Sequence, residues 1–188
     1  MKNSIAKSRL HFIAVKALAA WLLFLTVARA DPSPDAKEIA PPWRLQWGES
    51  SDQIEALLKG ARATIVERRK TDDGEAWTVE GILQSSLRRT IFYFKTGMLI
   101  AVELQYQNAN WDNNKYNDFM AQIRQRIAAQ YGEGQLVARS KTPIEGNIMQ
   151  TVVGYKWNES NSCLELFYFS AENATEIFRT ISVHYKAY

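Results

Sequence analysis

The sequence predicts an α+β domain in which an antiparallel sheet carries two helices on one face. Residues 112–131 place apolar side chains at the three-and-four spacing of a helix face. A shorter segment with the same spacing, residues 51–59, precedes them, and strand-like sequence interrupted by turns follows each of the two segments. Helices and antiparallel strands in this order pack most simply as two layers around one core.

Residues 1–30 have the features of a secretory signal peptide. A basic start is followed by an apolar run over 17–27, and Ala28-Arg29-Ala30 provides the small residues that a signal peptidase recognises. The apolar run is much shorter than the about 20 residues that span a bilayer. We therefore expect cleavage after Ala30, no stable membrane anchor, and a mature protein that is periplasmic or secreted.

Charge and residue counts argue against several classes of function. The chain has 23 Lys and Arg against 20 Asp and Glu, but residues 1–30 hold five of the bases and no acid, which leaves 18 against 20. This balance lacks the basic footprint of a nucleic-acid-binding protein. Cys163 is the only cysteine and His184 the only histidine after residue 30. We expect no disulfide, no metal site of the usual His and Cys kind, no cofactor and no catalytic triad.

The N-terminal part of the mature chain is predicted to contain a lead-in and a short strand. Residues 31–40 combine prolines and charges without an aromatic residue, which is typical of a flexible segment. The α+β domain is then expected to span residues 41–188. At its start, Trp43, Leu45 and Trp47 alternate with polar residues as in an edge strand.

Both helices carry recognisable end signals. Ser50 followed by Gln53 has the form of a capping box before residues 51–59. Asp112 offers a side-chain oxygen to the first turn of the longer helix, and Gly132 permits the left-handed conformation that ends it. The apolar stripe of the longer helix consists of Tyr116, Phe119, Met120, Ile123 and Ile127.

The remaining sequence predicts antiparallel strands joined by turns. Asp73-Gly74 and Thr96-Gly97 are strong hairpin signals. The predicted strands are residues 63–69, 76–83, 88–95, 98–107, 135–140, 147–157, 162–170 and 176–186.

The two halves of the chain share a pattern. Ile91-Phe92-Tyr93-Phe94 precedes a turn and then V-x-L-x-Y, whereas Leu166-Phe167-Tyr168-Phe169 precedes a turn and then I-x-V-x-Y. We therefore predict a tandem repeat of a helix-plus-four-strand unit over about residues 50–107 and 112–186. The alternative is a chance recurrence of aromatic strands.

A short motif carries a family resemblance. The segment Trp47-Gly48-Glu49-Ser50-Ser51-Asp52-Gln53-Ile54, continued by Leu57-Leu58-Lys59-Gly60, resembles the first helix of the SmpA/OmlA (BamE-like) family of small bacterial envelope modules. The apparent duplication resembles the beta-lactamase inhibitor protein-like family. The resemblance covers this motif and the element order over most of the mature chain. It implies an exported, non-catalytic module that acts through protein contacts.

Three functions are compatible with these observations. A binding module with a protein partner in the cell envelope agrees with the many aromatic residues, because Trp and Tyr are common interface anchors. A small-ligand-binding protein would use an aromatic cleft between the halves. A hydrolase would use carboxylates such as Glu103 and Glu165. The sequence leaves the partner and the oligomeric state open.

Hairpin register predicts the surface that would bind. A two-residue turn at 96–97 puts Tyr93 opposite Ile100 and Ile91 opposite Val102, and these residues would form the helix-covered core. A patch of phenylalanines would then lie on the other face, either exposed for binding or covered by loops or by the segment around Trp43 and Trp47. The candidate binding residues are Phe92, Phe94, Phe167, Phe169, Arg88, Glu103, Glu165 and His184.

Overall fold

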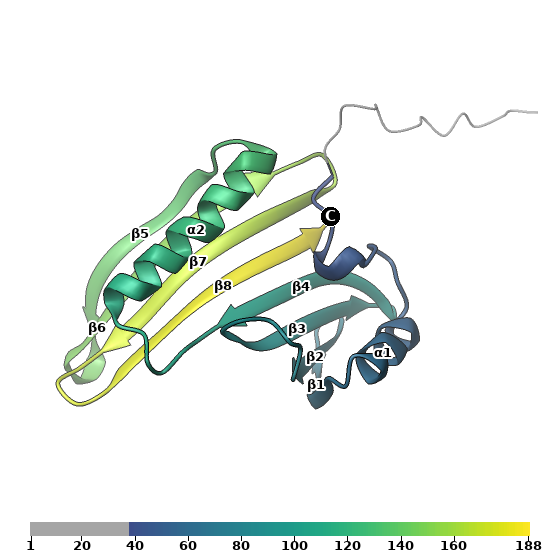
Figure 1. The fold of residues 1–188 in the computed structure, drawn as a ribbon, viewed down its shortest axis with the longest axis horizontal. Coiled ribbons are helices and arrows are strands. Elements are labelled where there is room, and N and C mark those ends of the chain that lie inside the picture. Colours follow the sequence, from purple (N-terminus) through teal and green to yellow (C-terminus); the bar gives the residue numbers. More distant parts are fainter. Residues whose placement is uncertain (1–37) are drawn as a thin grey trace, which may run out of the picture. The chain divides into compact units, whose positions relative to one another are not determined.

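The computed structural model describes residues 38–188, which form an eight-stranded antiparallel sheet with two α-helices (Figure 1). The predicted α+β class and the antiparallel sheet are confirmed. The predicted signal peptide and residues 31–37 of the predicted lead-in lie outside the described residues.

The elements follow one another as a helix and four strands, twice. They are η1 (Pro42–Arg44), α1 (Ser51–Gly60), β1 (Thr64–Thr71), β2 (Gly74–Glu80), β3 (Leu87–Lys95), β4 (Met98–Tyr106), α2 (Asn113–Tyr131), β5 (Gln135–Ile144), η2 (Glu145–Asn147), β6 (Ile148–Asn158), β7 (Ser162–Glu172) and β8 (Ile177–Ala187). The strand order in the sheet is β1-β2-β3-β4-β8-β7-β6-β5. Strands β4 and β8 therefore meet in the middle, and β1 and β5 form the edges.

Local capping explains where both helices begin. The Ser50 hydroxyl accepts a hydrogen bond from the Gln53 backbone N–H at 3.3 Å, and the Gln53 side chain accepts one from the Ser50 N–H at 2.9 Å. This is the predicted capping box. At α2, the Asp112 carboxylate accepts a hydrogen bond from the Lys115 N–H at 2.8 Å. Gly132 follows α2 with a φ of 80°.

One row of paired residues establishes that both helices cover the same face of the sheet. Directly opposed residues on neighbouring strands share a face. From β1 to β6 the row is Arg68, Trp77, Phe92, Val102, Tyr185, Leu164 and Trp157. At one end, the Arg68 guanidinium donates to Glu55 of α1 at 2.6 Å. At the other end, the Trp157 indole donates to the carbonyl of Gly132, directly after α2, at 2.8 Å. We call this side the helix-covered face and the opposite side the helix-free face.

The core lies between the helices and the helix-covered face. Ile54 of α1 and Met120 of α2 belong to the same buried cluster, together with Val102, Leu166 and Val183 of the central strands. Burial of such apolar side chains is the main stabilising contribution to the fold. The helix-free face has no described helix above it, and its side chains define the candidate site below.

Residues 43–47 do not form the predicted edge strand. They begin in the 3₁₀ turn η1, where Trp43 and Arg44 have φ values of 60° and 62°. A left-handed backbone cannot continue a strand, so the alternation of Trp and Leu was misleading here. Strand-like pairing begins later, where the Gly48 N–H donates to the carbonyl of Leu99 at 3.0 Å.

The predicted lead-in also ends earlier than expected. Ile39 is 0% exposed, and its N–H donates to the Ser162 hydroxyl at 2.9 Å. Its carbonyl accepts a hydrogen bond from the Trp47 indole at 2.9 Å. The one large apolar side chain of residues 31–40 therefore belongs to the core, and the fold already includes Ile39.

Candidate functional site

A β-bulge in the β3–β4 hairpin decides which side chains reach the helix-free face. Lys95 pairs with Met98 across the two-residue turn, as predicted, and Phe94 pairs with Leu99. The next pair, however, is Tyr93 with Ala101, so that Ile100 is an extra residue. A bulge of this kind shifts the pairing of the two strands by one residue. Beyond the bulge, each residue of β3 therefore shares a face with the other set of alternating β4 residues than it would in a regular hairpin.

The predicted placement of Phe92 and Phe94 on the binding face is therefore wrong. Phe92 pairs with Val102 on the helix-covered face, and the two phenylalanines are 1% and 2% exposed. The ring of Trp43 lies 6.3 Å from Phe92, between ring centroids, and the ring of Trp77 lies 4.6 Å from Phe94. These two phenylalanines are core residues. Ile91 and Tyr93, which were expected in the core, lie on the helix-free face instead.

The other predicted residues lie mostly on the helix-free face. His184 of β8 lies between Glu103 of β4 and Glu165 of β7, with which it forms strand pairs on either side. Phe167 and Phe169 are half-buried on the same face of β7. Arg88 does not join them: it is exposed at the start of β3, 3.6 Å from a carboxylate oxygen of Glu80.

Three phenylalanines form a partly exposed aromatic row on the helix-free face. The row consists of Phe167, Phe169 and Phe178. The ring of Phe178 meets Phe169 edge to face, with 6.0 Å between centroids, and Phe167 meets the His184 ring at 5.9 Å. An added Cβ at Gly154 would overlap the ring of Phe167, so this ring lies directly over the glycine. Sequence reasoning missed Phe178, although its even spacing from His184 along β8 is a usable signal.

Glu103 is the most buried carboxylate of this face. The residue is 8% exposed. The Tyr93 hydroxyl donates to one carboxylate oxygen at 2.9 Å, and the Gln105 amide donates to the other. Burial, followed by the adjacent Glu103 charge, raises the pKa of Tyr93, so the hydroxyl keeps its proton as a donor. The two hydrogen-bond donors to Glu103 are thus both neutral.

Glu165 has a different environment, because two ammonium groups bind it. The ammonium of Lys186 lies 2.7 Å from one carboxylate oxygen and that of Lys156 lies 3.5 Å from the other. Burial acts to raise the pKa of Glu165, but the hydrogen bonds and charges of the two lysines outweigh it and hold the pKa below its usual value. Glu165 is therefore a fully compensated anion.

His184 is largely neutral at pH 7. Burial lowers its pKa below the usual value of 6.5 and Lys186 acts in the same direction, against the opposing effects of Glu103 and Glu165. The same nitrogen, Nε2, lies 3.0 Å from the Ser182 hydroxyl and 3.6 Å from Glu103. In a Ser/His/acid triad the acid and the serine bind opposite ring nitrogens. The arrangement is consequently not that of a proton relay.

A hollow lies beside Glu103, and we call it the Glu103 pocket. Its volume is about 320 Å³. The residues that line it are Tyr93, Ile100, Ala101, Val102, Glu103, His184, Tyr185 and Lys186. The pocket thus combines the bulge residue, a small alanine and the polar groups described above.

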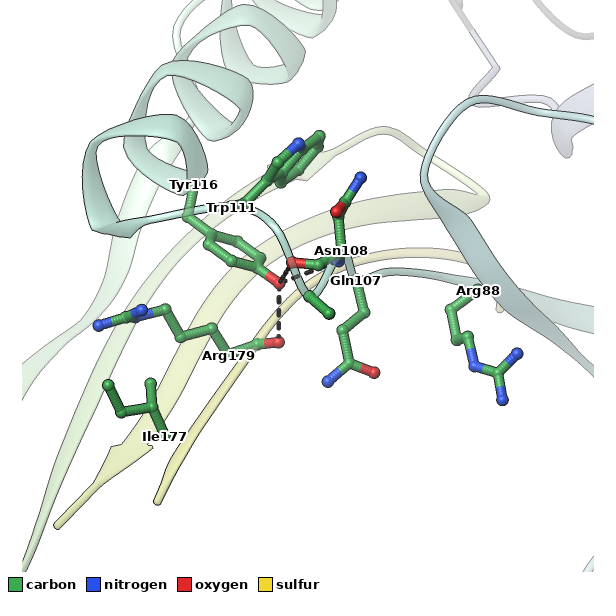
Figure 2. A pocket seen from close by; sticks show the side chains of 8 residues that line it. Arg88, Gln107, Asn108, Trp111, Tyr116, Ile177 and Arg179 are labelled. Carbon is green, nitrogen blue, oxygen red and sulfur yellow. Dashed lines mark hydrogen bonds between the residues drawn. The ribbon is translucent and has the colours of Figure 1, made fainter. Parts of the chain in front are cut away.

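A second hollow, the junction pocket, lies where the two halves of the sheet meet at the start of α2 (Figure 2). Its volume is about 510 Å³. Its lining residues are Arg88, Gln107, Asn108, Ala109, Trp111, Tyr116, Ile177 and Arg179. Figure 2 shows the Tyr116 ring reaching down from α2 with Trp111 beside it; the two ring centroids are 5.3 Å apart.

Hydrogen bonds to the backbone fix the Tyr116 side chain that lines the junction pocket. The Tyr116 hydroxyl accepts from the Asn108 N–H at 3.1 Å and lies 3.3 Å from the carbonyl of Arg179. The Arg179 guanidinium is bound to Glu172 at 3.0 Å. The side chains of Gln107 and Arg88 lie across the hollow from Arg179 (Figure 2).

Neither the metal-ligating side chains of the described residues nor comparison with known proteins assigns a function to this chain. Among residues 38–188, no group of three or more His, Cys, Asp or Glu side chains is arranged to hold a metal ion. None of the helices in this part of the chain is both long and apolar enough to cross a membrane. Comparison with protein-family models, curated proteins and solved structures finds no match to this chain.

Proposed function

We propose that the chain is an exported, non-catalytic binding module that contacts a protein partner in the cell envelope through the helix-free face of its sheet. The observation that carries this proposal is the aromatic row, whose members remain partly exposed on a face that no described helix covers. Phe178 is 45% exposed. Partly exposed aromatic patches bordered by charge are typical of contact sites.

The chemistry of the same face supports binding over catalysis. Glu165 is compensated by two lysines, and His184 contacts Ser182 and Glu103 through a single nitrogen. A carboxylate-dependent hydrolase would need one carboxyl group held protonated beside a second that is ionised. The lysines beside Glu165 favour its ionised form, so Glu165 does not fit the role of the protonated acid.

We further propose that the domain arose as a tandem repeat of a helix-plus-four-strand unit. The element order repeats, and the strand order is a mirror image about β4 and β8. The V-x-L-x-Y and I-x-V-x-Y motifs pair with each other, since Val102 faces Tyr185 and Tyr106 faces Ile181. The halves differ at the bulge, which turns Phe94 into the core while its counterpart Phe169 remains on the helix-free face.

Site-specific photo-crosslinking tests the binding proposal. A photoreactive phenylalanine analogue at position 178 should capture a discrete partner in intact cells, whereas the analogue at exposed Leu57 of α1 should not. Ser substitutions at Phe167 and Phe169 should abolish the crosslink at 178 without a large change in thermal midpoint. Equal crosslinking from positions 57 and 178, or crosslinking that is unaffected by these substitutions, would contradict the proposal.

A small-ligand-binding protein is the second candidate, because the junction pocket combines aromatic walls with a few polar groups. Its volume lies within the range of about 300–1,000 Å³ that ligand sites occupy. Native mass spectrometry of protein isolated from the envelope should then find a bound small molecule. Trp111→Ala should lose this molecule and Trp43→Ala should retain it. A wild-type mass equal to that of the bare chain would exclude this candidate.

A further inference from the structure

Glu103 and Glu165 differ in the number of lysine ammonium groups bound to them. Both carboxylates lie on the helix-free face, one on either side of His184. The ammonium groups of Lys156 and Lys186 are both bound to Glu165. The only basic side chain in an ion-pair position beside Glu103, among the residues that the structure describes, is His184 at 3.6 Å. Because burial lowers the pKa of His184, it provides little positive charge at pH 7.

Glu103 is therefore a nearly buried carboxyl group that, among the residues the structure describes, has no permanently charged cation within ion-pair distance. Its neutral donors, Tyr93 and Gln105, satisfy hydrogen bonds but do not cancel the charge. An ionised carboxylate that is removed from water is costly unless a cation approaches it. A basic group that reaches this carboxylate would gain a charge-assisted hydrogen bond of above-average strength.

The Glu103 pocket provides the space for such a group. It has a volume of about 320 Å³, and Glu103 is one of the residues that line it. The bulge at Ile100 interrupts the regular ladder there, and Ala101 leaves the adjacent position small. The aromatic row begins on the neighbouring strand, where Phe167 contacts the His184 ring. A side chain that enters the pocket would thus lie at the border of the proposed contact surface.

We propose that the Glu103 pocket binds a basic side chain of the partner protein, with arginine preferred. This inference rests on the proposed function and adds the chemistry of the partner. The planar guanidinium carries several donors, is more weakly hydrated than an ammonium, and stacks on aromatic rings such as Tyr93. Lys186 lines the same pocket, but its ammonium group forms an ion pair with Glu165.

Nuclear magnetic resonance titration with ethylguanidinium tests this site without a known partner. Ethylurea is the matched probe, because it has nearly the same shape and no charge. Ethylguanidinium should shift the amide resonances of Glu103, Tyr93 and His184 in a saturable way, and ethylurea should not. Glu103→Gln should weaken the binding by about tenfold or more. Glu176→Gln, which removes an exposed charge elsewhere, should leave the binding unchanged.

A second variant keeps the test decisive if Glu103→Gln folds poorly. Lys186→Met removes the ammonium of a residue that lines the pocket, while Lys156 remains beside Glu165, so ethylguanidinium should bind more tightly. Absence of saturable shifts in the wild type, equal binding of ethylurea, or unchanged affinity in Lys186→Met would overturn the assignment. These outcomes are independent of crosslinking at position 178, so the pocket assignment and the proposed function can fail separately.

Discussion

His184 of β8 lies opposite Glu103 of β4, with its Nε2 3.6 Å from the carboxylate, yet it is predominantly neutral at pH 7. Burial has the largest effect on the pKa of His184 and lowers it, and the charge of Lys186 on the same strand lowers it further. The charges of Glu103 and of Glu165 on β7 act to raise this pKa. The relationship has a measurable consequence for stability.

We expect the protein to lose stability as the pH falls below about 6.5, the usual histidine pKa. The folded-state pKa of His184 is lowered, so the unfolded chain binds more protons in the window just below the unfolded pKa, and stability rises with pH there. His184→Gln should remove this part of the pH dependence. Thermal midpoints of both proteins between pH 7.5 and pH 5 provide the measurement, in which a constant difference between them would refute the assignment.

Phe92 and Phe178 should respond differently to truncation. Phe92→Ser places a hydroxyl and a cavity in the core, and we expect a loss of about 3 kcal/mol or more in the free energy of unfolding. Phe178→Ser lies on the helix-free face and should change it by less than about 1 kcal/mol. Urea denaturation of the two variants compares them directly. Similar losses would mean that the bulged register is incorrect.

Gly154 and Phe167 should be energetically coupled. An added methyl group at 154 overlaps the Phe167 ring, so Gly154→Ala should destabilise the protein by about 1–3 kcal/mol. When Phe167→Ala is already present, the same change should cost much less. A double-mutant cycle measures this coupling, and strictly additive effects would show that the ring does not lie over the glycine.

Ile39 should behave as a core residue although it precedes the predicted start of the domain. Ile39→Ala is expected to cost about 2–5 kcal/mol, because the side chain is fully buried. Ile177→Ala is the matched control, since this isoleucine is largely exposed. Chemical denaturation distinguishes them, and a negligible effect at position 39 would restore the longer lead-in.

The parts of the fold that depend on near neighbours could be predicted from the sequence. Ser50 caps α1 through Gln53, and Asp112 caps α2 through Lys115, over three residues in each case. The hairpin turn at Thr96 is likewise local. Such contacts depend on residue types that lie together in the sequence, and they need no knowledge of tertiary packing.

The candidate site was only partly predictable because its geometry depends on the bulge. Residues 99–102 are all apolar, so either alternation fits β4 and no local pattern marks Ile100 as the extra residue. Strand alternation predicts that Glu103, Glu165 and His184 share a face, and all three lie on the helix-free face. Their meeting in one cluster also requires β4 to pair with β8, and this pairing joins residues far apart in the sequence.

The pairing of β4 with β8 also determines when the protein can complete its fold. β8 is the latest of the described strands in chain order, yet it lies in the middle of the sheet between β4 and β7. Until its 11 residues are present, β4 and β7 each offer an unpaired edge to other chains. Long-range pairings of this kind form slowly. A chain that emerges N-terminus first would therefore expose two unpaired strand edges until β8 has been synthesised. Aggregation through these edges would compete with folding during that interval.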